Sequence, residues 1–315
     1  MTKFLGAVLY CSLVLTATNC FAQTDDLEKL LDSISPPLDT KVSATFKATK
    51  LINAQSTETA KKGTLDFRIT HRFGNSGGAS GGGAHTMWGW DNSEDIRFSF
   101  DYGLTDKMHI GLARSKRQEN LDGSFKWRVL TQTTDNKMPV SVALYLDAAY
   151  TPVREVDLYA GIDTSVVHSM AHRLVYVTQL IVARKWNWRL STEIIGSYNH
   201  RNLVKGFTFD GNAESNDIVS VGGAIRFKLT KRFGLVFDYF QNFSAYRTGN
   251  PAYHNPLGIG CEIETGGHVF TLNFTNASGI IENDFIPNTT DDWLLGGFKF
   301  GFNISRAFTI VKPKM

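Results

Sequence analysis

The chain has 315 residues, and its 33 Lys and Arg against 30 Asp and Glu give a formal net charge of +3 at pH 7. This nearly balanced charge argues against a nucleic-acid partner. The 22 phenylalanines and six tryptophans favour a fold rich in strands over one rich in helices.

The first 22 residues predict a secretory signal peptide. Lys3 precedes an apolar run that ends in the small-residue site CFA, immediately before Gln23 and an acidic patch. The alternative is a lipoprotein with Cys20 lipidated, but Asn19 in front of the cysteine suits such a site poorly.

Cleavage of this peptide would change the charge and the cysteine content. It removes Lys3 together with Cys11 and Cys20, so the 33 basic residues fall to 32 against 30 acidic ones, a net charge of +2. Cys261 is then left without an internal disulfide partner, so the exported chain needs another source of stability. No later stretch approaches the roughly 20 apolar residues of a membrane helix. The mature chain is therefore either soluble or crosses a membrane as strands.

Residues 23–40, QTDDLEKLLDSISPPLDT, predict a short N-terminal periplasmic segment that contains one amphipathic helix. Its leucines and isoleucine recur at helical spacing, and Pro36 and Pro37 end the pattern. We expect this segment to lie on a surface; a plug or a partner-binding helix is the alternative.

From residue 41 to residue 315, apolar and polar side chains alternate along successive segments. A strand points successive side chains to opposite faces, so each such segment has one apolar and one polar face. The pattern spans this whole region and indicates one domain. Examples are LDFRITHRF (65–73), IRFSFDY (96–102), SFKWRV (124–129), VSVGGAIRFKL (219–229) and GGFKFGFNIS (296–305).

The connections between these segments alternate in length, as they do in outer-membrane barrels. Short turns are predicted at 103–107, 135–139, 184–188, 230–233 and 264–267, with long polar segments between them. Counting back from a last strand near 294–310 places every short turn on the periplasmic side. The count is about twelve strands, beginning near Gly63. Residues 43–51 are surplus: they pair at the seam, lie in the lumen, or make fourteen strands together with a hairpin around 156–170.

Alternation alone does not say which face meets water, because a soluble lipocalin-like barrel turns its apolar side inward. Three features favour a membrane barrel. The apolar face is rich in Phe, Leu, Val and Ile, with Trp188 and Tyr198 near strand ends, as in interfacial girdles. The polar face mixes Gly and Ser with charges, and twelve strands would leave a soluble barrel a large interior to fill. We therefore expect Phe300 to meet lipid and Lys299 to face the lumen. The predicted fold is an all-β, transmembrane, antiparallel up-and-down β-barrel.

Charged side chains on the polar face are the candidate functional residues. One interpretation is a set of cross-strand ion pairs that fill a narrow barrel. The other is a pore or pocket whose charges select solutes, with a mild basic excess that favours anions. The sequence leaves both open. The candidates for the lumen are Arg68, Arg72, Arg97, Asp101, Lys126, Arg128, Arg189, Glu193, Arg226, Lys228, Asp238 and Lys299.

No sequence motif for catalysis, metal or cofactor binding stands out. The glycine-rich stretch 74–85 lacks the lysine of a phosphate-binding loop, so we expect a flexible surface loop. His168 and His172 stand four apart but lack the glutamate of H-E-x-x-H, so no metal is predicted. Ser197 and His200 are close only in sequence, without a G-x-S-x-G elbow, and no catalytic residue is predicted.

Several segments resemble a family of outer-membrane β-barrel proteins of the Bacteroidota whose function is not established. They are GTLDFRITHRFG (63–74), DIRFSFDYGLTDKMHIGLARS (95–115), LIVARKW (180–186), YNHRNLV (198–204) and LTKRFGLVFDY (229–239). The resemblance implies the barrel fold and the outer membrane of a Gram-negative bacterium, and it says little about activity. One departure from bacterial barrels is that Phe308 is followed by TIVKPKM, so the chain does not end on an aromatic residue.

The sequence therefore predicts a non-enzymatic outer-membrane barrel, acting as a channel or a solute-binding barrel with a charged lumen. Its expected partners are outer-membrane lipid and small solutes or ions. The alternatives are an outer-membrane enzyme with a site at the loop end, a structural barrel with a filled lumen, and a soluble secreted barrel for an apolar ligand.

Overall fold

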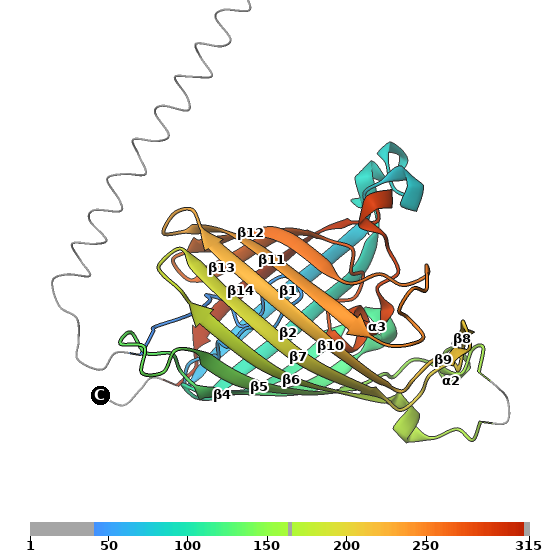
Figure 1. Ribbon diagram of the computed structural model, residues 1–315, viewed down its shortest axis with the longest axis horizontal. Helices are drawn as coiled ribbons and strands as arrows, with labels where there is room; N and C mark the ends of the chain where they lie inside the picture. The colour runs from blue at the N-terminus through green and yellow to red at the C-terminus, as the bar shows by residue number, and fades with distance from the viewer. Residues whose placement is uncertain (1–40, 163–165, 312–315) are drawn as a thin grey trace, which may run out of the picture.

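The computed structural model describes residues 41–162 and 166–311, and its alternating segments form the closed barrel of Figure 1. Twelve strands run antiparallel to their neighbours in chain order, and the last pairs with the first, which confirms the predicted up-and-down barrel. The predicted signal peptide and the segment 23–40 lie outside the described residues. The barrel strands are β1 (Thr64–Asn75), β2 (Ser93–Thr105), β3 (Met108–Ser115), β4 (Leu121–Leu130), β5 (Ser141–Tyr150), β6 (Leu174–Lys185), β7 (Leu190–Arg201), β10 (Asp217–Lys228), β11 (Phe233–Phe243), β12 (Leu257–Thr265), β13 (His268–Thr275) and β14 (Lys299–Thr309).

The register between strands keeps the two faces separate. Phe67 on β1 lies opposite Phe100 on β2, with ring centroids 5.0 Å apart, whereas Arg68 lies opposite Ser99 on the other face. At the closure between β1 and β14, Ile69 pairs with Ile304 of the final strand. Closing the sheet leaves no edge strand, so backbone groups are paired between strands and the barrel needs no disulfide.

The connections differ between the two ends of the barrel. At the short-turn end, five turns join β2 to β3, β4 to β5, β6 to β7, β10 to β11 and β12 to β13, as predicted. At the other end, the long-loop end, longer connections carry short helices (Figure 1). These are η1 (Gly78–Ser80), η2 (Ala84–Gly89), η3 (Arg117–Glu119), α2 (Glu155–Leu158), η4 (Met170–Arg173), α3 (Glu282–Asn288) and η5 (Trp293–Leu295), with a small hairpin of β8 (Thr208–Phe209) and β9 (Asn212–Ala213) between β7 and β10. Among the described residues, no helix has the length and apolar character needed to cross a membrane.

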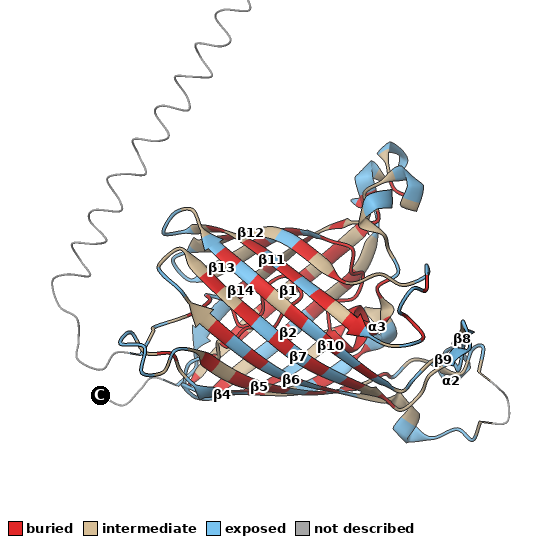
Figure 2. Ribbon diagram, in the orientation of Figure 1, coloured by how far each residue is buried: buried red, intermediate tan, exposed pale blue. Residues whose placement is uncertain are grey.

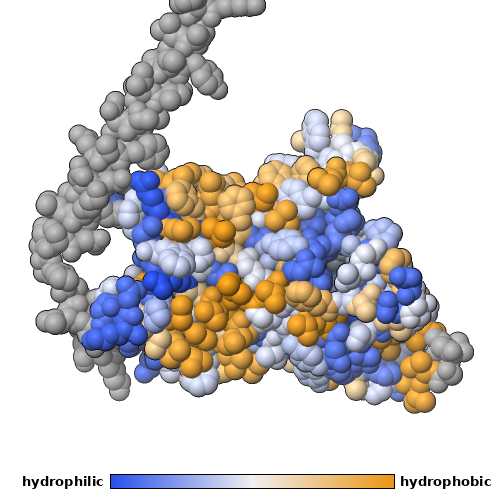
Figure 3. Space-filling view, in the orientation of Figure 1, coloured by the Kyte–Doolittle hydropathy of each residue, from blue (hydrophilic) through white to orange (hydrophobic). Residues whose placement is uncertain are grey.

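The outer face of the strands is apolar. Leu112 and Ile194, on β3 and β7, leave 70% and 66% of their surface exposed. Figure 2 shows exposed and buried residues alternating along the strands, and Figure 3 shows apolar patches over the barrel wall. Phe300 stacks on Trp90 with ring centroids 5.1 Å apart, on the outward face as expected. An apolar outside around a polar inside is the reverse of a soluble barrel, so the soluble alternative does not fit.

The barrel is filled from within by the chain that precedes β1. Residues 43–51 lie inside the barrel, which decides among the three sequence alternatives. Residues 49–56, here called the inner hairpin, turn back on themselves through bonds from the Leu51 amide to the Ala54 carbonyl, 2.8 Å, and from the Ser56 amide to the Thr49 carbonyl, 3.0 Å. An apolar cluster joins this hairpin to α3 and to the inner face of the wall. It includes Phe46, Leu51, Ile52, Tyr145, Ile181, Ile195, Val236, Phe240, Phe285 and Ile286.

Candidate functional site

Asp238 on β11 anchors the tip of the inner hairpin. Its carboxylate accepts hydrogen bonds from the backbone amides of Asn53 and Ala54, at 2.6 and 3.0 Å, and from the Asn53 side-chain amide at 3.0 Å. Asp238 is 2% exposed, so these bonds form where water does not compete. A predicted lumen carboxylate therefore holds part of the chain itself.

Two of the predicted lumen cations grip the same hairpin through its carbonyl groups. Arg72 donates from Nη2 to the Ile52 carbonyl at 2.9 Å. Lys126 donates from Nζ to the carbonyls of Thr49 and Ser56, at 2.7 and 3.1 Å. Both cations are fully buried, and their charges are directed at these backbone dipoles. Together with Asp238 they hold the hairpin from three strands: β1, β4 and β11.

The inner hairpin meets α3 inside the barrel. Glu282 Oε1 accepts from Lys50 Nζ at 2.6 Å and from Gln55 Nε2 at 3.1 Å. Behind this ion pair, the ring of Phe285 packs edge-on against Phe240 of β11, with centroids 5.2 Å apart. The segment that precedes β1 and the loop that precedes β14 thus meet inside the barrel.

Other predicted lumen charges pair across the wall. Arg97 reaches Asp122 through two bonds of 2.5 and 2.6 Å, which links β2 to β4. Arg226 contacts Glu262 and Glu264 of β12, with bonds of 2.8 and 2.6 Å. Pairs of this kind rigidify the wall, in line with the first sequence interpretation of these charges.

The other seven lumen candidates fall into two groups, three with ion pairs and four described by their place in the barrel. Arg68 pairs with Asp66, Arg128 with Glu58, and Lys299 with Asp291. The other four candidates differ in position and burial. Asp101 and Lys228 are half-buried on the inner faces of β2 and β10, Glu193 is buried with both carboxylate oxygens unpartnered, and Arg189 lies in the turn before β7 with its guanidinium over the Trp188 ring. Because β7 begins at Leu190, Arg189 belongs to the rim at the short-turn end and not to the interior.

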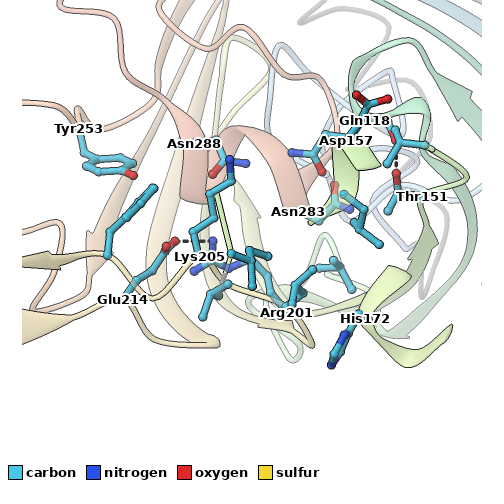
Figure 4. Close-up of a pocket in the computed structure, with 17 residues that line it drawn as sticks. Gln118, Thr151, Asp157, His172, Arg201, Lys205, Glu214, Tyr253, Asn283 and Asn288 are labelled. Atoms are coloured by element: carbon cyan, nitrogen blue, oxygen red, sulfur yellow. Dashed lines mark hydrogen bonds and ion pairs between the residues drawn. The ribbon is translucent and has the colours of Figure 1, made fainter. Parts of the chain in front are cut away.

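A pocket of about 500 Å³, here called the loop-end pocket, opens beside α3 at the long-loop end (Figure 4). Its walls come from the connections after β3, β5, β7 and β11 and from α3, so it is assembled from segments far apart in the sequence. Figure 4 shows Asn283 and Asn288 on α3, with Arg201 and Glu214 joined across the pocket wall. None of these residues belongs to the set of lumen candidates.

Two arginines share one carboxylate beside this pocket. Glu214 Oε1 accepts from Arg201 Nη1 and from Arg247 Nη2, both at 2.9 Å. Burial raises the pKa of Glu214, but the charge of Arg201 and the hydrogen bonds from both arginines outweigh it and leave the pKa below its usual value. The cluster carries one positive charge in excess. Arg247 also donates from Nε to the Pro287 carbonyl at 2.8 Å, which ties the cluster to α3.

Several buried polar atoms in this region have no hydrogen-bond partner among the described residues. Asn283 is 2% exposed, and neither its amide nitrogen nor its amide oxygen has a partner. Arg201 Nε and Arg247 Nη1 are likewise buried and unpartnered. An unpaired buried amide costs about 1–3 kcal/mol, so this arrangement is expensive unless something else supplies the partners.

Comparison with known proteins identifies the family. A model of the membrane-bound β-barrel domain family DUF5777 matches residues 46–308. The chain belongs to that family. The membrane-bound barrel has no match among the curated proteins.

Solved structures with a similar shape are outer-membrane barrels. The NanC porin has a TM-score of 0.47 at 8% identity and covers 78% of this chain and 100% of its own. The KdgM porin gives 0.43 at 7%, with 78% and 99% covered. Omp33 of Acinetobacter baumannii gives 0.37 at 9%, with 81% and 100% covered.

The histidines and the serine considered as possible site residues either contact other side chains or lie on different faces of a strand. His168 stacks on Tyr159 with centroids 3.8 Å apart, and His172 Nδ1 lies 3.0 Å from the Tyr159 hydroxyl. Ser197 is buried inside the barrel, whereas His200 lies on the outer face of β7 and pairs with Asp217 at 2.7 Å. Within the described residues, no group of three His, Cys, Asp or Glu side chains could hold a metal ion.

The glycine-rich stretch 74–85 begins in the last two residues of β1 and continues as a surface loop that docks on the loop before β14. The Gly77 amide donates to the Gly296 carbonyl at 2.9 Å, and Ser80 Oγ donates to the Leu295 carbonyl at 3.1 Å. A Cβ atom on Gly77 would lie 2.4 Å from the Gly296 Cα. Glycine at both positions permits this close backbone approach.

Proposed function

We propose that this protein is an outer-membrane barrel of a Gram-negative bacterium that binds a small solute at its long-loop end and is gated by the inner hairpin. The predicted signal peptide, the even strand number and the apolar outer wall support this location. In such barrels the short turns face the periplasm, so the loop-end pocket would face the outside. Outer-membrane lipid surrounds the wall, and small solutes or ions are the ligands.

One observation carries the proposal: α3 lines the loop-end pocket and also contacts the inner hairpin. Asn283 and Asn288 line the loop-end pocket, while Glu282 on the same short helix holds Lys50 of the inner hairpin. If a solute binds more tightly when α3 has moved than when α3 is in place, it shifts the equilibrium between the seated and the displaced inner hairpin. The size of the shift equals the difference between the two binding free energies. Passage through the barrel then requires the inner hairpin to leave its place.

No catalytic step is part of this proposal. An enzyme with a site at the loop end would need a nucleophile and a base within hydrogen-bonding reach. Ser197 and His200, the pair considered from the sequence, lie on opposite faces of β7. The polar groups that line the loop-end pocket are suited to binding.

A structural barrel with a permanently filled lumen is the second candidate, and the apolar cluster inside the barrel favours it. Phe46, Leu51 and Ile52 are each at most 1% exposed. Burying such a side chain contributes about 1.5–3 kcal/mol, so displacing all three without a replacement would be costly. The two candidates differ in whether weakening the contact between hairpin and α3 opens a path.

The test is conductance across a planar bilayer that contains the refolded protein. Glu282→Gln leaves Lys50 with an unmatched buried charge, and Asp122→Asn, the matched control, does the same to Arg97 within the wall. Breaking a buried pair costs about 3–5 kcal/mol, so we expect openings to be roughly a hundredfold to several thousandfold more frequent in Glu282→Gln. We expect wild type and Asp122→Asn to stay closed.

Two results would count against gating. A folded Glu282→Gln variant that remains closed would favour the structural barrel. Steady open steps from the wild-type protein would show that the inner hairpin does not close the lumen. Heat-modifiable migration on gels establishes folding of each variant before its conductance is compared.

A further inference from the structure

We propose that the loop-end pocket binds a small hydroxylated organic acid, whose carboxylate pairs with Arg201 and Arg247 and whose hydroxyl groups pair with Asn283. This inference names the solute class and so rests on the proposed function. It concerns residues that take no part in closing the lumen directly, and binding to it can be measured without transport.

The charge of the cluster argues for an anion. Two guanidinium groups share the single Glu214 carboxylate, which leaves one positive charge in excess. Guanidinium groups bind carboxylates strongly, through charged and often paired hydrogen bonds. Arg201 Nε and Arg247 Nη1 are the buried donors without a partner, so the cluster keeps donor capacity after Glu214 is satisfied.

The positions of the arginines place the anion where two cavities meet. Arg201 lines the loop-end pocket, and Arg247 lines a neighbouring cavity of about 220 Å³. Tyr253 belongs to both cavities, and the Arg247 guanidinium lies 4.8 Å from its ring centre. Burial, aided by a hydrogen bond with Tyr246, raises the pKa of the Tyr253 hydroxyl to about 12, so this group adds no negative charge at neutral pH.

Asn283 argues for hydroxyl groups on the solute. A side-chain amide offers both donors and an acceptor, and a hydroxyl group can satisfy either kind. Because Asn283 is buried and unpartnered, a solute that supplies partners recovers the cost of that burial. A purely apolar ligand would leave the amide and both arginine donors unpaired, and a cation would meet the excess positive charge. The volume of about 500 Å³ falls in the usual range for a small-molecule site, roughly 300–1,000 Å³.

The test is titration calorimetry on the full-length protein in detergent, with D-gluconate as the probe and D-glucitol as its uncharged counterpart. We expect gluconate to bind at least tenfold more tightly than glucitol. Asn283→Leu should weaken gluconate binding at least tenfold without lowering the melting temperature, because the Asn283 side chain has no hydrogen-bond partner among the described residues to lose.

Asn273 provides the matched control. It is a buried asparagine on the inner face of β13, also with both amide atoms unpartnered, and it does not line the loop-end pocket. Asn273→Leu makes the same chemical change elsewhere, and we expect it to leave gluconate affinity within about twofold of wild type, as distant sites act independently.

Three outcomes would overturn the assignment. Equal affinity for gluconate and glucitol would remove the role of the arginine cluster. An equal loss in Asn283→Leu and Asn273→Leu would remove Asn283 from the site. Absence of binding at millimolar gluconate would refute the solute class, while the conductance of Glu282→Gln would still report on gating by itself.

Discussion

The inner hairpin and the loop-end pocket are two buried polar regions in one barrel, and they satisfy their polar groups differently. No buried side-chain N or O atom of residues 49–56 is left without a hydrogen-bond partner. At and beside the loop-end pocket, Asn283, Arg201 and Arg247 each retain a buried atom without a partner among the described residues. The groups that hold the hairpin are less completely satisfied, because Arg72 Nε and Glu282 Oε2 lack a partner among the described residues. A satisfied polar group favours one arrangement, whereas a buried unsatisfied group needs an explanation, such as strain, water or a ligand. The first region therefore stabilises the barrel, and the second is suited to a ligand.

The largest effect is expected from weakening the anchor of the inner hairpin. Asp238→Asn replaces an acceptor of three hydrogen bonds with a group that must turn its NH₂ toward one of the donors. We expect a loss of about 3 kcal/mol in the free energy of unfolding, because hydrogen bonds to a buried charged group are strong. Urea unfolding in lipid vesicles measures it.

Glu193→Gln is the control for this change. Glu193 is as buried as Asp238 and also faces inward, but neither of its carboxylate oxygens has a partner. We expect this variant to stay within about 1 kcal/mol of wild type, since no hydrogen bond is lost. Equal losses of unfolding free energy in the two variants would mean that the hydrogen bonds of Asp238 do not stabilise the barrel. The contrast between the inner hairpin and the loop-end pocket would then be wrong.

A medium effect is expected where two backbones touch at the long-loop end. Gly77→Ala places a Cβ 2.4 Å from the Gly296 Cα, so the glycine-rich loop must move away at a cost of about 1–3 kcal/mol. Gly78→Ala, one residue further on, meets nothing within 4 Å and serves as the control. Protease cleavage between β1 and β2 should accelerate in the first variant alone.

The same pair of variants separates the pocket from the rest of the long-loop end. The glycine-rich loop does not line the loop-end pocket, so gluconate affinity should be unchanged in Gly77→Ala. A large drop in gluconate affinity would show that the shape of the loop-end pocket depends on the glycine-rich loop as well, and it would contradict their independence.

The smallest effect is expected from acid. The pKa of Glu214 is lower in the folded protein than its usual value, so its ion pairs stabilise the loops at higher pH and are lost as the pH falls through the folded pKa. We expect cleavage of the loop between β7 and β10 by pepsin to rise a few-fold as the pH falls from the usual pKa of a glutamate, about 4.3, through the lower pKa of Glu214 in the folded protein. The loop of Glu214→Gln should be cleaved readily both above and below this pH range. If cleavage of that variant rises as much as cleavage of the wild type when the pH falls, a group other than Glu214 causes the effect.

The wall of the barrel could be predicted from the sequence because its signals are local. Alternation along a strand fixes which side chains share a face, and the five short turns set the direction of each strand. Arg97, Arg226 and Lys299 face inward for this reason. Arg189 does not follow the rule, because it precedes the first residue of β7 and side-chain alternation holds only within a strand.

The contents of the lumen could not be predicted in the same way. Residues 43–51 alternate much as a strand does, yet Phe46 and Leu51 are buried inside the barrel and meet no lipid. The arginine cluster beside the loop-end pocket brings together Arg201 and Arg247, which are distant in sequence and both pair with Glu214. Contacts of this kind depend on how loops fold back into the barrel, and no periodic pattern records them.

The measurement that tests the filled lumen most directly is the reactivity of a cysteine placed at Ile52. Ile52 is fully buried at the tip of the inner hairpin, and Cys261→Ser removes the native thiol first. A membrane-impermeant maleimide is applied to the refolded protein in vesicles, with Leu294→Cys, 93% exposed on a long loop, as the reactive control. We expect rapid labelling at position 294 and almost none at position 52. Labelling at comparable rates would show that the inner hairpin is not seated in the barrel, and it would contradict the account.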